Sequence, residues 1–183
     1  MADELIDICD ENNNIIGQGM KSEILRKGLW HRTARVFIYN SLGEILLQLR
    51  GKDKELYPDL WDVGAAGHVA AGEDYIETAV REAREELGLL IPKENLDLLM
   101  VEKFEQIWGK LSEKVFAGTY LAKFDGSIND LKIQADEVQE LKFIPADSLG
   151  KDVKEFPQKY TPHPEGYWME LINGVRKRLE TGA

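Results

Sequence analysis

The sequence of 183 residues contains a single cysteine, Cys9, and therefore no internal disulfide. This excludes the small disulfide-bonded scaffolds typical of extracellular proteins and favours a reducing, cytoplasmic setting. No run of about 18 apolar residues is present, which excludes a membrane-spanning helix of the usual length. The opening residues, MADELIDICDENNN, are acidic and polar, unlike a secretory signal or an arginine-rich transit peptide.

Basic residues are also scarce, with 23 Lys and Arg against 33 Asp and Glu and a formal net charge of −10. A chain of this charge does not offer the broad basic surface that binds nucleic acids or anionic membranes. A small anionic substrate is still compatible with it, because a bound divalent cation reverses the charge locally. The hydrophobic fraction of 43% suits the core of one compact domain, so we expect residues 1–183 to form a single domain.

Strand and helix patterns alternate along the chain and predict an α/β or α+β domain. Two apolar runs around an Asn-rich turn in residues 5–17 predict an N-terminal β-hairpin, within an extension that covers residues 1–28. Residues 34–50 predict a second hairpin around the turn NSLGE. Further strands are expected near 99–107, 114–123 and 140–144, and closing helices at 145–156 and 164–181.

The clearest helix covers about residues 74–87 and has signals at both ends. Asp74 and Glu77 have the spacing of a capping box, Gly88 supplies a left-handed stop and Pro92 prevents continuation. At about 100° per residue, five apolar side chains share one face, which we expect to pack against the sheet. They are Ile76, Ala79, Val80, Ala83 and Leu87.

Three carboxylates crowd the last turn of this helix, where the macrodipole disfavours negative charge. Glu82, Glu85 and Glu86 are helical neighbours, and each like-charged pair costs roughly 0.2–0.5 kcal/mol. Arg81 and Arg84 offset part of this repulsion but lie off the carboxylate arc. A divalent cation such as Mg²⁺ prefers oxygen ligands, so it would relieve the repulsion and hold substrate phosphates. We therefore interpret the arc as part of a metal site; a solvated helix surface is the alternative.

The same segment resembles the Nudix box, G-x5-E-x7-R-E-U-x-E-E-x-G-U, in which U is an aliphatic residue. Gly67 is followed after five residues by Glu73, and Glu73 after seven residues by R-E-A-R-E-E-L-G-L at residues 81–89. All fixed positions match, and the small Ala83 at the first U is a soft departure. A pattern specified at this many positions is far more specific than a lone glycine motif.

The resemblance implies a Nudix fold, in which a mixed β-sheet lies between helices and residues 67–89 form a loop–helix–loop. It implies that Glu82, Glu85 and Glu86 bind Mg²⁺ or Mn²⁺ and carry the catalysis, with the backbone carbonyl of Gly67 as a further metal ligand. It also implies structural roles for three other motif residues: Glu73, Arg81 and Gly88. The expected reaction is hydrolysis of a nucleoside diphosphate linked to another group, in which a carboxylate helps to activate water.

Outside the box, most of the chain is similar to the isopentenyl-diphosphate isomerase-like branch of Nudix proteins. The similar segments are DELIDICDENNNIIG, KGLWHRTARVFIYNSLGEILLQLR, KDKELYPDLWDVGAAGHV and YTPHPEGY. Isomerase activity is disfavoured, because Ala66 stands where the isomerase carries its catalytic cysteine. The isomerase also binds metal through histidines, to which His31 and His68 correspond, and Glu113 corresponds to one of its carboxylates. A further histidine is missing from residues 22–30, so a structural role is favoured for both histidines and metal binding stays open.

Charged residues of two loops are further candidates for contact with the substrate. Arg50 and Lys54, with Lys52 beside them, are placed to meet substrate phosphates; a solvated loop is the alternative. Glu137 and Glu140 lie where some Nudix hydrolases carry a water-activating acid, but a surface role is favoured for both.

The sequence thus predicts a cytoplasmic, Mg²⁺-dependent hydrolase of a small-molecule diphosphate, with no nucleic-acid or membrane partner. Diphosphate isomerization and a non-catalytic Nudix-fold binding module are the alternatives. The resemblance suggests a homodimer. Neither the substrate nor the general base follows from the sequence.

Overall fold

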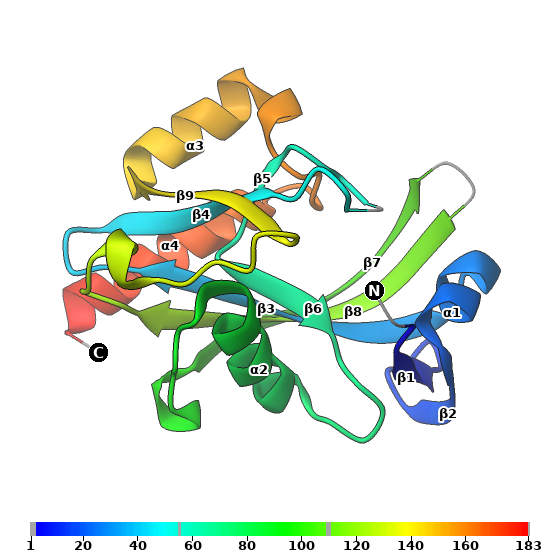
Figure 1. Cartoon of the computed structure of the whole chain (residues 1–183). Coiled ribbons are helices and arrows are strands. Elements are labelled where there is room, and N and C mark those ends of the chain that lie inside the picture. The colour runs from blue at the N-terminus through cyan, green and yellow to red at the C-terminus, as the bar shows by residue number, and fades with distance from the viewer. Residues whose placement is uncertain (1–2, 55, 109–110, 183) are drawn as a thin grey trace.

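The structure is a computed structural model that describes residues 3–54, 56–108 and 111–182. Figure 1 shows a layered arrangement of strands and helices, which confirms the predicted α/β class. In chain order, the elements are β1 (Leu5–Cys9), β2 (Ile15–Met20), α1 (Lys21–Lys27), β3 (Trp30–Tyr39), β4 (Glu44–Arg50), β5 (Trp61–Asp62), β6 (Ala65–His68), α2 (Tyr75–Leu87), β7 (Asp97–Trp108), β8 (Leu111–Lys123), β9 (Val138–Pro145), α3 (Ala146–Glu155) and α4 (Tyr167–Thr181). Short 3₁₀ turns occur at Lys93–Asn95, Ile128–Asp130 and Pro157–Lys159.

Within the described residues, nine strands form one mixed sheet with β3 at its centre. On one side, β3 runs parallel to β8 over its whole length, and β8 pairs antiparallel with β7. On the other side, β3 meets β1 at Trp30, β6 over residues 33–36 and β4 over residues 38–39. β4 then leaves β3 to pair with β5 and β9. The sheet therefore forks beside the middle of β3.

Alternation along β3 divides its side chains between two cores, because successive residues of a strand point to opposite faces. Val36 and Ile38 pack with α2 on one face, whereas Phe37 and Tyr39 pack with α3 and α4 on the other. In Figure 1, α2 lies below the sheet, with α3 above it and α4 behind it. The sheet is thus covered by helices on both faces, as expected. Phe37 is fully buried, so truncation to Ala should cost about 3–5 kcal/mol.

Helix α2 begins and ends where its sequence indicates. The Asp74 side chain accepts a hydrogen bond from the Glu77 N–H, and the Glu77 side chain accepts one from the Asp74 N–H. Gly88 ends the helix in the left-handed conformation, with φ of 65°. On the apolar face, Ala83 and Leu87 are fully buried against the sheet. The predicted capping box, stop and packing face are therefore confirmed.

Both predicted hairpins occur, as do β7, β8, β9, α3 and α4. The sequence also predicts an extended segment at the end of residues 51–63, where β5 lies, but it did not indicate α1 or β6. With two and four residues, β5 and β6 are too short to show a strand period, and they form because β4 and β3 offer partners for their backbone groups. In the described part of the chain, no helix has the length and apolar character needed to cross a membrane.

The N-terminal hairpin is anchored to the loop that precedes α2. The Asp7 carboxylate is buried and accepts hydrogen bonds from the Gly72 N–H at 3.2 Å and from the Gln18 side chain at 2.9 Å. The Ala71 N–H donates to the Leu5 carbonyl at 2.9 Å. The hairpin therefore helps to fix the backbone that leads from β6 into α2.

Candidate active site

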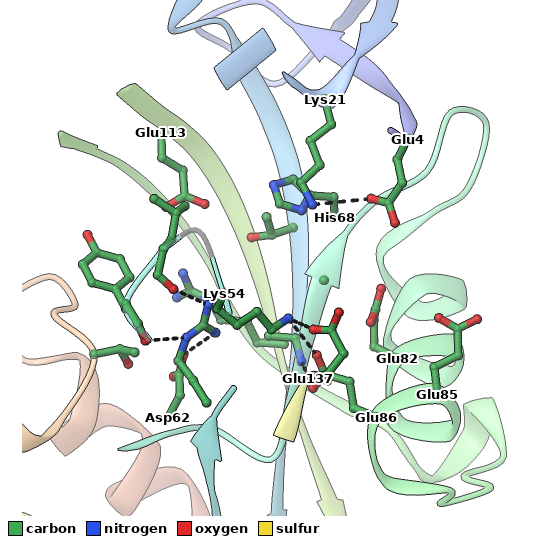
Figure 2. A pocket seen from close by; sticks show the side chains of 18 of the residues that line it. Glu4, Lys21, Lys54, Asp62, His68, Glu82, Glu85, Glu86, Glu113 and Glu137 are labelled. Atoms are coloured by element: carbon green, nitrogen blue, oxygen red, sulfur yellow. Dashed lines mark hydrogen bonds and ion pairs between the residues drawn. The ribbon is translucent and has the colours of Figure 1, made fainter. Parts of the chain in front are cut away.

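A pocket of about 300 Å³ opens beside the fork of the sheet, at the lower end of the range for small-molecule sites. β3 and β6 form part of its wall, α2 contributes carboxylates, and the loops after β4 and before α4 contribute basic and aromatic side chains. In Figure 2, the carboxylates of α2 lie on one side of this pocket, and Glu113 and Asp62 lie on the other.

Two of the three carboxylates expected at the metal site are buried beside β6. Glu82 and Glu86 are 9% and 4% exposed, whereas Glu85 lies at the exposed rim of the pocket. A Cβ atom added at Gly67 would overlap the Glu82 carboxylate. Only glycine at this position therefore leaves room for the carboxylate.

Arg81 connects the carboxylates of α2 to the loop before the helix. Its guanidinium lies 2.6 Å from Glu82 and 3.2 Å from Glu85. It also pairs with Glu73 at 3.3 Å and donates to the His68 carbonyl at 3.0 Å. Although the helical period places Arg81 off the carboxylate arc, its long side chain reaches the acids and offsets part of their repulsion. The contact with Glu73 holds the loop against the helix.

Glu86 occupies the most buried position of the three. Its Oε2 atom accepts hydrogen bonds from the Gln48 side chain at 3.0 Å and from the Ala66 N–H at 3.3 Å. Lys54 Nζ lies 3.9 Å from Oε1. Burial nevertheless raises the pKa of the Glu86 carboxyl to about 7 and also raises that of Glu82. A cation placed between these carboxylates would favour their ionised forms.

The loop before β9 brings Glu137 into the same pocket. Glu137 is 7% exposed and forms an ion pair with Lys54, so the surface role predicted for it is wrong. The reason is a close approach of two loops, in which the Gly51 N–H donates to the Glu137 carbonyl at 2.8 Å. Glu140 is exposed, as expected, and Lys52 is exposed as well.

Arg50 is held at the pocket by the loop that follows β4. Its guanidinium donates to the backbone carbonyls of Leu56 at 2.8 Å and Tyr57 at 3.0 Å, and it pairs with Asp62 at 3.4 Å. Arg50 and Lys54 both line the pocket, so the alternative of a solvated loop does not describe them. Two cations next to buried carboxylates suit the binding of phosphate oxygens.

A second group of metal-ligand types lies beside the same pocket. The ligand atoms of His31, His68 and Glu113 all lie within 4.8 Å of one another. Both histidine Nε2 atoms are buried and have no hydrogen-bond partner among the described residues. Burial lowers the pKa of His31 to about 4 and that of His68 well below its usual value, so both rings are neutral at pH 7. The three residues are therefore chemically suited to hold a divalent cation.

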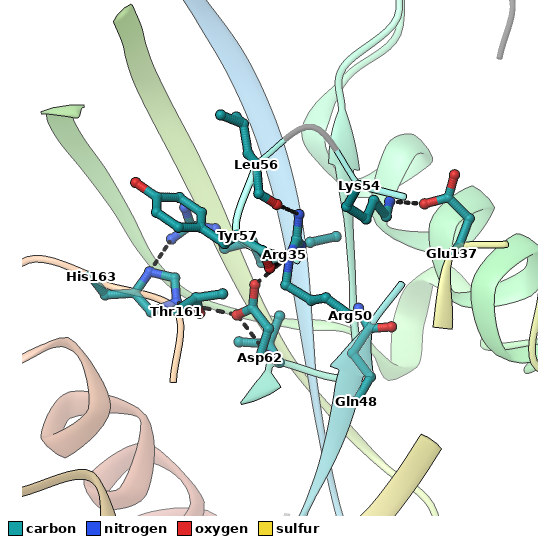
Figure 3. Close-up of polar contacts among 12 residues, drawn as sticks. Arg35, Gln48, Arg50, Lys54, Leu56, Tyr57, Asp62, Glu137, Thr161 and His163 are labelled. Atoms are coloured by element: carbon teal, nitrogen blue, oxygen red, sulfur yellow. Dashed lines mark hydrogen bonds and ion pairs between the residues drawn. The ribbon is translucent and has the colours of Figure 1, made fainter. Parts of the chain in front are cut away.

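Sequence reasoning missed a polar cluster at the end of the pocket away from α2, which Figure 3 shows. His163 Nε2 lies 3.2 Å from Asp62 Oδ1, and Arg35 lies 3.4 Å from His163 Nδ1. Burial opposes ionisation of Asp62, but the hydrogen bond from His163 and the charge of Arg50 keep its pKa below its usual range. The one available signal was Arg35 itself, a charged residue within the strand pattern A-R-V-F-I-Y.

Comparison with known proteins identifies the family. The family model described as NUDIX domain matches residues 29–164. The chain belongs to the Nudix family. An uncharacterized Nudix hydrolase of Clostridium acetobutylicum is 33% identical over 154 residues, which cover 82% of this chain and 74% of that protein. Nudix hydrolase 3 of Arabidopsis thaliana is 29% identical over 187 residues, which cover 98% of this chain but only 24% of the plant protein.

The fold of this chain is also seen in a solved structure. The crystal structure of DR0079 from Deinococcus radiodurans has a TM-score of 0.70 and 23% sequence identity, with coverage of 95% of this chain and 98% of that chain. Both of these curated relatives are named Nudix hydrolases. Nudix hydrolases generally use divalent metal ions such as Mg²⁺.

The residues of the Nudix box fit such an ion. Glu82 and Glu86 are buried carboxylates, and Glu85 lies beside them at the rim. The space next to the Glu82 carboxylate exists only because residue 67 has no side chain. Carboxylate and carbonyl oxygens are the ligands that Mg²⁺ prefers.

Proposed function

We propose that this Nudix protein is a Mg²⁺-dependent hydrolase that cleaves a diphosphate linkage in a nucleoside-diphosphate-type or related small molecule. The observation that carries the proposal is the pair of buried carboxylates, Glu82 and Glu86, at a pocket that also holds Arg50 and Lys54. Acids that bind a metal and bases that bind phosphate thus line one cavity.

The proposed roles follow from these positions. Glu82, Glu85 and Glu86 hold the cation, together with the Gly67 carbonyl. When bound, a divalent cation neutralises the diphosphate and stabilises the charge that develops on its oxygens. Arg50 and Lys54 orient the phosphates, and the carboxylates of α2 also help to activate the attacking water. Glu137 is a further candidate for this last role, because it contacts Lys54 in the same pocket.

The remaining motif residues keep the site in shape. Arg81 ties Glu73 to the carboxylates of α2, and Gly88 ends the helix directly after them. These contacts support a structural role for the three residues.

We also propose that, within the Nudix family, this chain belongs to the isopentenyl-diphosphate isomerase-like branch. The convergence of His31, His68 and Glu113 favours it. Ala66 lines the pocket where the isomerase has its cysteine, and Cys9 lies in β1, so isomerization itself stays disfavoured. Deuterium uptake from heavy water into isopentenyl diphosphate would reveal it.

A substrate panel with Mg²⁺ tests the proposal, with nucleoside-diphosphate sugars, dinucleotides, nucleotides and prenyl diphosphates. We expect release of phosphate or a nucleoside monophosphate from at least one class. Glu86→Gln should abolish turnover while the fold, measured by circular dichroism, is kept. Glu140→Gln, at an exposed position of β9, is the matched control and should keep full activity.

Calorimetry gives a second, independent readout. Wild-type protein should take up Mg²⁺ or Mn²⁺, and Glu86→Gln should bind either ion more weakly. No uptake with or without a diphosphate would contradict the proposal. Ligand-induced thermal stabilisation without turnover would instead support a binding module.

We also propose a single domain for residues 1–183, a cytoplasmic setting and a homodimer. Limited proteolysis, cell fractionation and sedimentation test these three statements.

A further inference from the structure

Arg35 occupies the end of the pocket away from the α2 carboxylates. Register places it on the same face of the sheet as Ala66 of β6 and Thr119 of β8, and its side chain lines the pocket. The guanidinium carbon lies 5.0 Å from the ring centre of Phe104 and 5.4 Å from that of Tyr167. Aromatic faces attract a guanidinium and hold its plane, so these rings limit how Arg35 can turn.

Hydrogen bonds from Asp62 through His163 fix the orientation of Arg35. Arginine donates only, so His163 Nδ1 is the acceptor in its contact with Arg35 at 3.4 Å. His163 Nε2 is then protonated, and it donates to Asp62 Oδ1 at 3.2 Å. The His163 ring also stacks on Tyr167, with centres 4.0 Å apart. The group that holds Arg35 is therefore itself held in one orientation.

This arrangement leaves Arg35 with donors to spare. Arginine has five N–H donors; one donates to His163, and the Tyr167 hydroxyl is a second partner. The charges of Asp62 and Glu113 also act on Arg35 from a distance. Among the described residues, no carboxylate forms an ion pair with Arg35, whereas Arg50 pairs with Asp62 and donates to two backbone carbonyls. A guanidinium that is held in a pocket, with no described carboxylate at ion-pair distance, is suited to bind an oxyanion.

Position separates Arg35 from Lys54, one of the two bases assigned to the diphosphate; the other, Arg50, pairs with Asp62. Lys54 contacts Glu137 and lies near Glu86, on the α2 side of the pocket. In Figure 3, Arg35 lies with Tyr57 and His163 on the side away from Lys54 and Glu137. A ligand whose diphosphate meets the α2 carboxylates would therefore extend toward Arg35 with its remaining part.

We propose that Arg35 binds a second anionic group, a phosphate or a carboxylate, on the part of the substrate beyond the diphosphate. This rests on the proposed function, because the diphosphate fixes the other end of the ligand. Arg35 is thus a specificity residue: it selects diphosphates that carry an additional negative charge over those that end in a neutral group. Asp62 and His163 act through Arg35 as positioning residues.

A series of non-hydrolysable ligands tests the proposal. Methylenebisphosphonate stands in for the diphosphate, and alkyl esters of it carry chains of graded length that end in carboxylate, phosphate or methyl. Affinities are measured by calorimetry with Mg²⁺ present. At one chain length, we expect wild-type protein to bind an anionic ligand about tenfold to a hundredfold more tightly than its methyl-ended partner, as for a charge-assisted hydrogen bond. Comparison of the carboxylate-ended and phosphate-ended ligands shows which anion binds better at Arg35.

Variants of Arg35 show whether this residue causes the preference for anion-ended ligands. Arg35→Met fills the space between the rings and should abolish the preference, while its affinity for bare methylenebisphosphonate stays as in wild type. Arg35→Lys keeps the charge without the planar fork and should retain part of the preference. Arg84→Gln removes an exposed arginine of α2 and is the matched control.

Each outcome is decisive. A preference that persists in Arg35→Met, or that is missing from wild type at every chain length, overturns the proposal while the proposed function stands. Failure of wild type to bind methylenebisphosphonate with Mg²⁺ overturns the proposed function, and this inference with it. Unchanged binding of bare methylenebisphosphonate by Arg35→Met shows that this variant is folded.

Discussion

The two ends of the pocket handle charge in opposite ways. At the α2 end, acids exceed bases: Glu82, Glu86 and Glu137 are buried together, with Lys54 among them. At the other end, the acid Asp62 is already engaged by His163 and Arg50. Glu113 lies on the same side, but among the described residues no carboxylate forms an ion pair with Arg35. One end is suited to a cation and the other to an anion.

This difference shows how a strongly acidic chain can bind a multiply charged anion. The net charge of −10 describes the whole molecule, whereas recognition depends on a few fixed groups within one pocket. Four predictions follow in order of decreasing expected effect: the first and the last test whether the ends act independently, and the other two test the structure around the pocket.

Gly67→Ala should damage only the α2 end. Its Cβ atom would overlap the Glu82 carboxylate, so the acid must move away from the metal position. We expect turnover of the best panel substrate to fall by about 10²–10³-fold, which corresponds to several kcal/mol of charge stabilisation. Metal affinity, measured by calorimetry, should fall with it. Gly17→Ala, which meets open space, is the matched control. Wild-type metal affinity in Gly67→Ala would show that the carboxylate position is not critical.

The burial of His31 beside the pocket can be tested through the pH dependence of the free energy of unfolding. Its pKa is about 4 in the folded chain, against the ordinary histidine value of 6.5, so the unfolded state binds more protons between these pH values. The free energy of unfolding should therefore be retained above pH 6.5 and should decrease by about 3 kcal/mol as the pH falls to 4. Urea unfolding with EDTA measures this, and His68 contributes in the same direction. An equal decrease in His31→Gln would rule out His31 as a cause.

Asp7→Asn tests the anchor between the N-terminal hairpin and the loop before α2. The substitution weakens two hydrogen bonds of a buried carboxylate, and the free energy of unfolding should decrease by about 1–2 kcal/mol. Urea denaturation provides the measurement. Glu11→Gln, an exposed residue of the same hairpin, should change it by no more than about 0.5 kcal/mol. Equal effects in the two variants would mean that the hairpin does not depend on Asp7.

His163→Phe should affect only the Arg35 end. Phenylalanine keeps the stacking on Tyr167 but removes the acceptor that orients Arg35. We expect the preference for anion-ended bisphosphonates to weaken by about tenfold, while binding of the bare bisphosphonate is unchanged. A loss of both would show that the two ends of the pocket are coupled.

Prediction from the sequence succeeded where the relevant residues are close in the chain. Asp74, Glu77 and Gly88 set the limits of α2 through contacts of a few residues, and the structure has all three as expected. Prediction failed where distant segments meet. Glu137 reads as a surface residue within its own segment, and only the contact between the Gly51 and Glu137 loops places it in the pocket.

The Nudix box, the helix that carries it and the arc of carboxylates can all be read from the sequence, because helical periodicity and capping are local. The tertiary structure alone decided that Glu82 and Glu86 are buried while Glu85 is exposed, since burial depends on which strand lies beside the helix. It also decided the Arg35 end, which combines residues of β3, β5 and the loop before α4. Such a cluster has no sequence spacing of its own, because the pairing of the strands, and not the order of the chain, sets the distances within it.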